Sequence, residues 1–553
     1  MDLLPKRDVL ARLDPAGLGL AVAKVPIGAA RNPFGVMWAG ARLWRDLGEG
    51  VSGAAARAWG VDPPEALTPA AKDRRFIDSA WDRSPWFFAQ RQAYLAWGHW
   101  MQELASECSS PPDRQKTAFA LQLLVDALAP TNFLLSNPAA LRKAWQTAGL
   151  SVVKGQRNFL RDLVANRGMP CQVDRSAFEV GANLAATAGQ VVFRNDLMEL
   201  LQYAPRTKTV HQVPLLLSPP WINKYYIMDL APKRSLVEWA VDHGHTVFAI
   251  SYRNPDASMR AVALDDYLVQ GPLQALDVVG DITGAERTNL VGLCLGGTMT
   301  VMLQAYLAAK GDRRVHSATL LNTMVDFSQP GPLGVFTDPT TIERLERKMA
   351  KRGLDKADMA KTFNALRAND LIWNYVASSW LMGEKPPAFD ILAWNGDSTR
   401  MPANMHSFYL RSCYLENRLA EDEMSLAGVN LHVGDIETES YIVAAVEDHI
   451  APWRSSYATT SLVGGPVRFV LTSSGHIAGV VNPPGPKARH WVNEDLTGDA
   501  DAWRAGATEV SATWWEDWAT WIAARAGPRG RPPGMGSKAY PALGDAPGTY
   551  ILG

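Results

Sequence analysis

Apolar residues recur at helical spacing through much of the first 180 residues. The clearest series begins after residue 72, and further helices are predicted over 114–128, from Asn137-Pro138 onward and over 153–164. Asn137 is suited to cap a helix and Pro138 to occupy its first position. Residues 1–70 are rich in Ala, Gly and Pro, so we expect them to be loosely ordered or to form short helices. The pattern predicts an α-helical N-terminal domain over residues 1–180.

From residue 181 onward, short β-prone runs alternate with helical spans such as 234–242 and 265–281. The predicted strands are 191–193, 213–217, 246–250, 288–293, 318–322, 440–446 and 467–471. This alternation is typical of a mostly parallel sheet with helices on both faces, so residues 181–553 are predicted to form an α/β domain. The irregular, helix-prone stretch 326–424 is placed as a lid or cap, and the Gly/Pro-rich tail 527–553 is expected to be weakly ordered.

Composition excludes several classes of protein. The chain of 553 residues has a net charge of −1 and no long basic block, which argues against a nucleic-acid partner. No run reaches the 18 or so apolar residues of a transmembrane helix, and the N-terminus has neither the clean cationic lead nor the apolar run of a signal peptide. The four cysteines are scattered without a CxxC pair. This spacing is typical of a protein from the reducing cytoplasm and argues against a structural metal site.

The most informative stretch is Gly292-Leu293-Cys294-Leu295-Gly296-Gly297, where an apolar strand turns sharply into a helix. This is the layout of the nucleophile elbow of α/β-hydrolases, with a thiol in place of the serine. Glycines flank Cys294 because a Cβ would clash with the neighbouring strand and helix. The helix N-terminus favours a thiolate and offers N–H groups to an oxyanion. These residues alone are equally compatible with a buried structural cysteine.

Partners for Cys294 follow later in the chain. Asp448 and His476 each come just after a predicted strand, and the order nucleophile, acid, histidine is that of α/β-hydrolases. His476 would act as the general base for the thiol, and Asp448 would orient the imidazole. We prefer His476 to its rival His449, because a residue adjacent to Asp448 would diverge from it.

Two other carboxylates are rivals for the acid. Glu447 is the stronger of them, and Asp435 is weaker because no clear strand leads into it. An oxyanion hole would use the backbone N–H of Leu295 and a second N–H from the loop 218–224, which we place near Ile222.

Several segments together resemble one family closely, the polyhydroxyalkanoate synthases, in particular the single-subunit kind that acts on short-chain monomers. The matching segments are residues 219–230, 251–256, 292–297, 369–375, 394–399, 447–453 and 475–484. The likeness runs from about residue 72 to residue 550 and is least informative over residues 1–70. Trp221 departs from the small residue or cysteine expected at its position.

The resemblance implies that the enzyme polymerises (R)-3-hydroxyacyl-CoA, with 3-hydroxybutyryl-CoA as the expected monomer, and releases CoA. It implies no cofactor, because CoA is part of the substrate, and no metal. It also implies a homodimer on the surface of polyester granules in the cytoplasm, with a lid tied to dimerisation. Two alternatives stay open: an acyl-CoA thioesterase or polyester depolymerase with the same triad, and a non-catalytic granule-surface subunit.

Overall fold

The computed structural model describes residues 15–63, 65–71, 73–352 and 364–553. These residues divide into two compact units. The described part of the first unit runs to residue 174 and takes in 364–388, and the second unit comprises 175–352 and 389–553. Within the described ranges, no helix combines the length and the apolar character needed to cross a bilayer.

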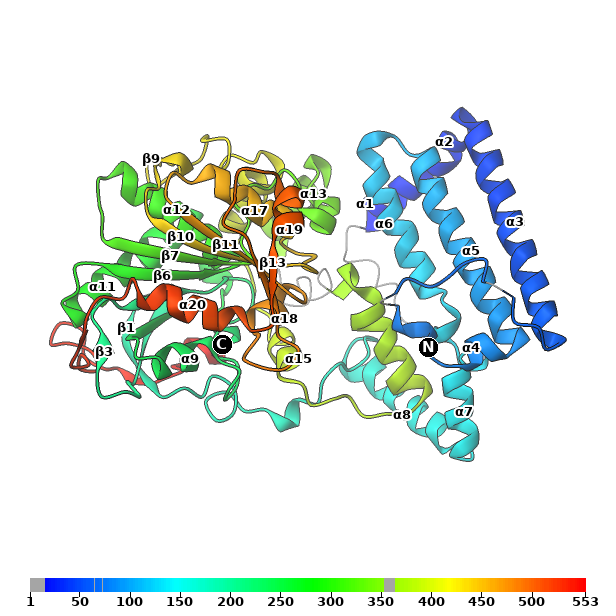
Figure 1. Ribbon diagram of the computed structural model, residues 1–553, viewed down its shortest axis with the longest axis horizontal. Coiled ribbons are helices and arrows are strands. Elements are labelled where there is room, and N and C mark those ends of the chain that lie inside the picture. The colour runs from blue at the N-terminus through cyan, green and yellow to red at the C-terminus, as the bar shows by residue number, and fades with distance from the viewer. Residues whose placement is uncertain (1–14, 64, 72, 353–363) are drawn as a thin grey trace. The chain divides into compact units, whose positions relative to one another are not determined.

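The first unit is helical, as the apolar spacing predicts. Its two longest helices, α3 and α5, lie side by side (Figure 1). Its helices are α1 (Pro15–Ala23), α2 (Val25–Arg31), α3 (Pro33–Ala58), α4 (Ala80–Arg83), α5 (Pro85–Cys108), α6 (Pro111–Ala127), α7 (Pro138–Gln146) and α8 (Leu150–Ala165). The predicted start at Asn137-Pro138 is confirmed, since the Asn137 side chain accepts from the N–H of Ala140 at 3.1 Å.

Residues expected to be loosely ordered or to form short helices include the 26-residue helix α3. Asn32 caps this helix by accepting from the N–H of Gly35 at 3.0 Å, and Pro33 follows at the first position. The prediction also covered residues 1–14, which lie outside the described residues. The Ala- and Gly-rich composition therefore did not indicate the long helix α3, which begins directly after its cap, Asn32.

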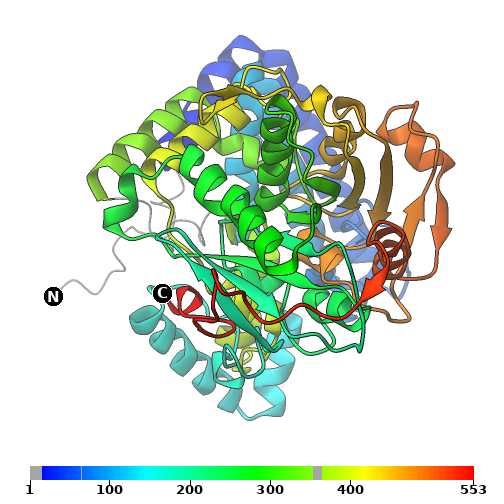
Figure 2. The same cartoon turned by 90° about the vertical axis from the view of Figure 1, so that its left-hand side faces the viewer.

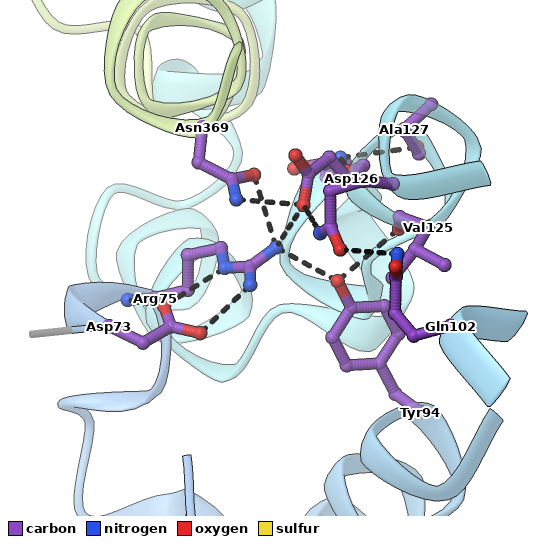
Figure 3. A network of polar contacts seen from close by, with 10 residues as sticks. Asp73, Arg75, Tyr94, Gln102, Val125, Asp126, Ala127 and Asn369 are labelled. Atoms are coloured by element: carbon purple, nitrogen blue, oxygen red, sulfur yellow. Dashed lines mark hydrogen bonds and ion pairs between the residues drawn. The ribbon is translucent and has the colours of Figure 1, made fainter. Parts of the chain in front are cut away.

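A partly buried polar network joins four segments of the first unit (Figure 3). The Arg75 guanidinium donates to Asp73 at 2.8 Å, to the Tyr94 hydroxyl at 2.9 Å and to the Asn369 side-chain oxygen at 3.1 Å. The Asn369 amide in turn donates to Asp126 at 2.8 Å. Because Asn369 lies almost three hundred residues from Arg75, the network fixes the later segment to the helical unit.

The stretch 326–424, predicted as one lid within the catalytic domain, is divided in the structure. Its residues 353–363 lie outside the described part of the chain, and residues 364–388 belong to the helical unit. A second contact there is the Trp380 indole, which donates to Asp162 at 2.9 Å. The division differs from the prediction because polar partners on α6 and α8 hold this segment, and spacing in the sequence does not reveal them.

The second unit is built on an 11-stranded sheet, which can be followed in Figures 1 and 2. The strand order is β13-β12-β11-β10-β7-β6-β4-β5-β2-β1-β15. The six strands from β11 to β5 are parallel, and the strands beyond them at both edges are antiparallel. The predicted mostly parallel sheet is therefore confirmed.

The central strands are buried along their whole length, which is why they appear in the sequence as continuous apolar runs. The larger strands are β1 (Gly189–Arg194), β2 (Met198–Tyr203), β4 (Leu215–Ser218), β5 (Val247–Tyr252), β6 (Thr288–Leu293), β7 (Val315–Leu321), β10 (Glu439–Ala445) and β11 (Val467–Thr472). The short strands are β3 (Val210–His211), β8 (Ser425–Leu426), β9 (Val429–Asn430), β12 (His490–Val492), β13 (Thr508–Val510), β14 (Arg529–Gly530) and β15 (Gly544–Asp545).

Helices connect these strands. They are α9 (Leu236–Asp242), α10 (Leu264–Leu268), α11 (Gln274–Thr283), α12 (Leu295–Ala309), α13 (Pro339–Arg352), α15 (Asp390–Asn395), α16 (Ala403–Tyr409), α17 (Trp453–Leu462), α18 (His476–Val480), α19 (Ala500–Gly506) and α20 (Trp514–Ala523). Several of them, including α11, α12 and α17, pack on the sheet. Helix α12 is buried on nearly every side. It therefore belongs to the core, and the site at its N-terminus rests on a rigid element.

The tail 527–553, expected to be weakly ordered, carries ordered contacts. Strand β15 pairs with β1, and the red C-terminal segment is seen beside these strands in Figure 2. The buried Glu199 carboxylate on β2 accepts from the N–H groups of Thr549 and Tyr550, both at 2.9 Å. Gly and Pro thus allow this segment to turn, while contacts to β1 and β2 position it.

Candidate active site

Cys294 lies at the turn between β6 and α12 in a left-handed backbone conformation, with φ 52° and ψ −119°. Its N–H donates to the carbonyl of Leu321 at 2.8 Å, which ties the turn to β7. A Cβ at Gly292 would come within 2.5 Å of Gly297 Cα, and one at Gly296 would overlap the Ser218 carbonyl. The predicted reason for the flanking glycines is therefore confirmed, and the strain is of the kind that collects at functional sites.

The structure brings Cys294, Asp448 and His476 together from the ends of β6, β10 and β11. His476 Nδ1 lies 2.6 Å from Asp448 Oδ2, and Cys294 is close enough to the imidazole to influence its pKa. Burial by itself would lower the pKa of His476, but the Asp448 carboxylate and the Cys294 thiolate outweigh burial and raise this pKa well above its ordinary value. This arrangement favours the protonated form of His476.

Asp448 is held independently of the histidine. Its Oδ1 accepts from the N–H groups of Ile450 at 2.8 Å and Ala451 at 2.9 Å, and its side chain is fully buried. The rival carboxylates Glu447 and Asp435 are exposed. The carboxylate that meets the imidazole of His476 is that of Asp448, and His449 follows it in the turn with its ring partly exposed.

The predicted oxyanion donors lie in the elements expected for them. Leu295 is the first residue of α12, and an N–H at that position cannot find an acceptor within its own helix. The loop 218–224 follows β4, whose Ser218 pairs with Gly292 on β6. Ile222 is partly buried in this loop. Its role as the second donor stays a prediction.

Two tyrosines, which the sequence analysis did not single out, lie near Cys294. Burial raises the pKa of Tyr409 and of Tyr414, and in both residues the charge of Cys294 contributes to the rise. Trp221 packs edge-on against Tyr409, with ring centroids 5.8 Å apart. Cys294, which is itself partly exposed, therefore lies beside aromatic rings, of which those of Tyr409 and Trp221 are buried.

A second group supports the short helix α18, which begins at His476. The indoles of Trp514 and Trp515, on α20, donate to the carbonyls of Gly479 and Val480, each at 2.9 Å. Asn322 donates to the carbonyl of His476 itself. The many tryptophans of the C-terminal region were predicted mainly as core residues, and these two also fix the helix that carries the histidine.

The site contains a nucleophile, a histidine and an acid but no set of metal ligands. Among the described residues, no group of three or more His, Cys, Asp or Glu side chains is arranged to hold a metal ion. The chemistry that these side chains can perform is acyl transfer through a thioester on Cys294.

Comparisons with known proteins agree with this site. The model of the family "Poly-beta-hydroxybutyrate polymerase (PhaC) N-terminus" matches residues 72–240, and that of the "alpha/beta hydrolase fold" matches residues 220–483, which confirms the predicted fold. A poly(3-hydroxyalkanoate) polymerase of Methylorubrum extorquens is 44% identical over 504 residues, covering 90% of this chain and 83% of the relative.

A relative from Cupriavidus necator covers nearly the whole chain. This protein, a poly(3-hydroxyalkanoate) polymerase subunit PhaC, is 41% identical over an alignment of 562 positions. The alignment covers 99% of this chain and 91% of the relative. The corresponding subunit of Rhizobium meliloti is 43% identical over 87% of this chain and 79% of its own length. These similarities show that the chain belongs to the poly(3-hydroxyalkanoate) polymerases, a family of acyltransferases.

Proposed function

We propose that this enzyme polymerises (R)-3-hydroxyacyl-CoA, with 3-hydroxybutyryl-CoA as the expected monomer, and releases CoA. Cys294 is the nucleophile, His476 the general base and Asp448 the residue that orients it. The observation that carries the proposal is the contact of 2.6 Å between His476 and Asp448, beside the Cys294 elbow of a family member.

The first step is exchange between thioesters. The Cys294 thiolate attacks the acyl carbonyl carbon, the C–S bond to CoA breaks, and the CoA thiolate takes the proton held by His476. The acyl group remains a thioester and keeps its activation. An oxygen ester on serine would lose that activation, so a cysteine in the elbow suits transfer to a second hydroxyl group.

Elongation then forms an ester between two units. His476 accepts the proton of a 3-hydroxyl group as its oxygen attacks the enzyme-bound thioester, and the Cys294 thiolate leaves. The hydroxyl must compete with water for the same thioester. The buried Tyr409 and Trp221 and the partly buried Tyr414 support this selectivity, because aromatic rings restrict the access of water to the thioester.

The wider assembly is part of the same proposal. We propose that the active form is a homodimer on polyester granules in the cytoplasm, and that the insert 326–424 acts as a lid whose opening is tied to dimerisation. Support for this comes from family membership. Sedimentation of the purified protein with and without 3-hydroxybutyryl-CoA would test it, and a protein that stays monomeric while making polymer would contradict it.

The test of function is to add 3-hydroxybutyryl-CoA to the purified enzyme and follow free thiol, insoluble polyester and free 3-hydroxybutyrate together. We expect CoA release with polyester and little free acid, and no release by Cys294→Ala although that variant stays folded. CoA release matched by free acid would make the enzyme a thioesterase. Full activity of Cys294→Ala would overturn the mechanism.

A further inference from the structure

The loop after β4, in which we place the second oxyanion donor, is bonded to a distant segment of the same unit, residues 394–399, in addition to the contacts of Lys224 with the C-terminal residues Ile551 and Gly553. Thr399 lies at the end of this segment and is buried. Its hydroxyl donates to the carbonyl of Trp221 at 3.2 Å and accepts from the N–H of Asn223 at 3.0 Å. One hydroxyl therefore holds the residues on both sides of Ile222.

Two more residues of the segment bind the loop further along. The Trp394 indole donates to the carbonyl of Lys224 at 2.7 Å. The Asp397 carboxylate lies 3.3 Å from Lys224 Nζ and accepts from the Tyr226 hydroxyl at 3.1 Å. The segment thus makes five polar contacts with residues 221–226, and none of them was evident from the sequence.

The loop needs external support because its backbone is strained. Asn223 has φ 63°, a left-handed conformation that is uncommon outside glycine. Trp221 anchors the loop from its other side, with its ring against Tyr267 and Tyr409. Between these two fixed residues, the peptide N–H of Ile222 has little freedom to turn.

This loop lies next to the nucleophile. The carbonyls of Ser218 and Pro219 border the space beside Gly296, so close that a Cβ at Gly296 would overlap them. Tyr409, which contacts the Trp221 ring, is near enough to Cys294 for the charge of the thiol to raise the tyrosine pKa. A change in the position of this loop would therefore alter the surroundings of the Cys294 thiol.

We infer that Thr399 and Asp397 are positioning residues that hold the loop 221–226 so that the N–H of Ile222 faces the oxyanion of an acyl group on Cys294. The inference rests on the proposed role of Cys294. It assigns a catalytic purpose to a segment of the insert that does not itself touch the acyl group. Without the Thr399 hydroxyl, the N–H of Asn223 and the carbonyl of Trp221 lose their partner and the peptide can rotate.

The experiment compares two reactions of the same thiol. In acylation by p-nitrophenyl acetate, the thiolate adds to a carbonyl, an oxyanion forms and p-nitrophenolate leaves. In alkylation by iodoacetamide, the thiolate displaces iodide from a saturated carbon and no oxyanion forms. Both require the Cys294–His476 pair and the same access route. Only acylation requires the oxyanion donors.

We expect Thr399→Val, which keeps the volume of the side chain, to slow acylation by at least about tenfold and at most by the roughly 10²- to 10³-fold that is typical of losing an oxyanion donor. Alkylation should change less than twofold. Thr399→Ser, which keeps the hydroxyl, should restore acylation. The control is Ser398→Ala, since Ser398 is equally buried and bonds only to the Asn395 carbonyl of its own segment, at 3.3 Å.

Either of two results would overturn the inference. Acylation by Thr399→Val at the wild-type rate would show that the loop needs no such support. A parallel loss of acylation and alkylation would show a general structural role. Failure of the proposed function gives a different result. If the wild-type enzyme is acylated but makes free acid instead of polyester, the proposed polymerisation is refuted and the test of Thr399 remains valid. A wild-type Cys294 that is not acylated at all refutes both.

Discussion

Replacing Asp448 by asparagine tests the role of the acid with little change in shape. In the native site Oδ1 accepts two backbone N–H groups and Oδ2 lies 2.6 Å from Nδ1 of His476. An amide oxygen can keep the two backbone bonds. The amide nitrogen must then face His476, and because it is a donor, the imidazole has to lose its Nδ1 proton. The proton moves to Nε2, the nitrogen that would otherwise accept the proton of the thiol.

The expected loss of acyl transfer follows from this tautomer. The corresponding change in a serine triad costs about 10⁴ in kcat. The charge-assisted hydrogen bond to His476 contributes about 1.5–3 kcal/mol, or about tenfold to 150-fold, so it explains only part of that loss. We therefore expect Asp448→Asn to lower CoA release by about 10³ to 10⁴. Its thermal unfolding should change little at high pH, because both backbone bonds persist.

The pH dependence of stability gives a second readout. His476 has a pKa raised well above its ordinary value, so between about pH 6.5 and the raised value the native enzyme holds a proton that the unfolded chain lacks. This stabilisation is fully present below pH 6.5 and is lost as pH rises through the raised pKa, by up to about 1.4 kcal/mol per unit. With an amide at position 448, burial lowers the pKa of His476. The loss of folding stability above pH 6.5 should therefore disappear in Asp448→Asn.

The assay measures CoA release at saturating 3-hydroxybutyryl-CoA and the midpoint of thermal unfolding from pH 6 to 9 at one scan rate. Glu447→Gln is the control, because Glu447 is the exposed neighbour of Asp448 and its loss should change CoA release less than twofold. A loss of less than tenfold in Asp448→Asn, or a larger loss in Glu447→Gln, would show that Asp448 is not the orienting acid.

Two further predictions concern the histidine and the helical unit. His476→Gln should abolish acyl transfer because it removes the base, whereas His449→Gln should keep at least half the rate of CoA release, and the reverse ranking would identify His449 as the base. Arg75→Met should lower the free energy of unfolding of the helical unit by about 3 kcal/mol, since Asp126 keeps a buried charge without its cation. Arg74→Met, at the exposed neighbouring position, should leave chemical denaturation unchanged, and equal effects would argue against the network.

Local pattern was enough to predict the central sheet and the strand–turn–helix elbow that carries Cys294, the proposed nucleophile. Parallel strands covered on both faces must be apolar along their length, so β4, β6 and β10 appear as short uninterrupted apolar runs. The elbow is visible because its geometry requires small residues at fixed offsets from Cys294. Asp448 and His476 were identifiable because each follows such a run.

Strand β2 escaped prediction because its polar residues are buried. Glu199 and Gln202 are three residues apart, so they do not give the period-2 alternation of a half-exposed strand, and both are buried. Glu199 is satisfied by Arg194 and by backbone N–H groups about 350 residues later, and Gln202 by Gly534 and Gly536. Apart from Arg194, which lies on β1, these partners belong to the tail that was expected to be weakly ordered. A local pattern cannot supply partners that come from such a distance.

The support around the triad was hidden for the same reason. Thr399 and Trp394 meet their partners across about 170 residues, and Trp514 and Trp515 reach α18 across 35. Threonine and tryptophan are common core residues, and nothing in their local spacing distinguishes a hydroxyl or an indole that fixes a catalytic loop. The reacting groups can be recognised from their chemistry, whereas their supports become evident only from contacts.

Backbone strain shows how the sheet supplies this support. The left-handed residues Asn223, Cys294, Asn322 and Ser474 each follow one of the neighbouring parallel strands β4, β6, β7 and β11. Such conformations cost about 1–3 kcal/mol each and persist only where their surroundings fix them. Here the adjacent segment provides the fixing bond, as when Asn322 donates to the carbonyl of Val443 at 2.7 Å. Because each turn is held by its neighbour, a substitution that disturbs one turn should also displace the next. Such a substitution should therefore lower the rate of acyl transfer strongly while changing the free energy of unfolding little.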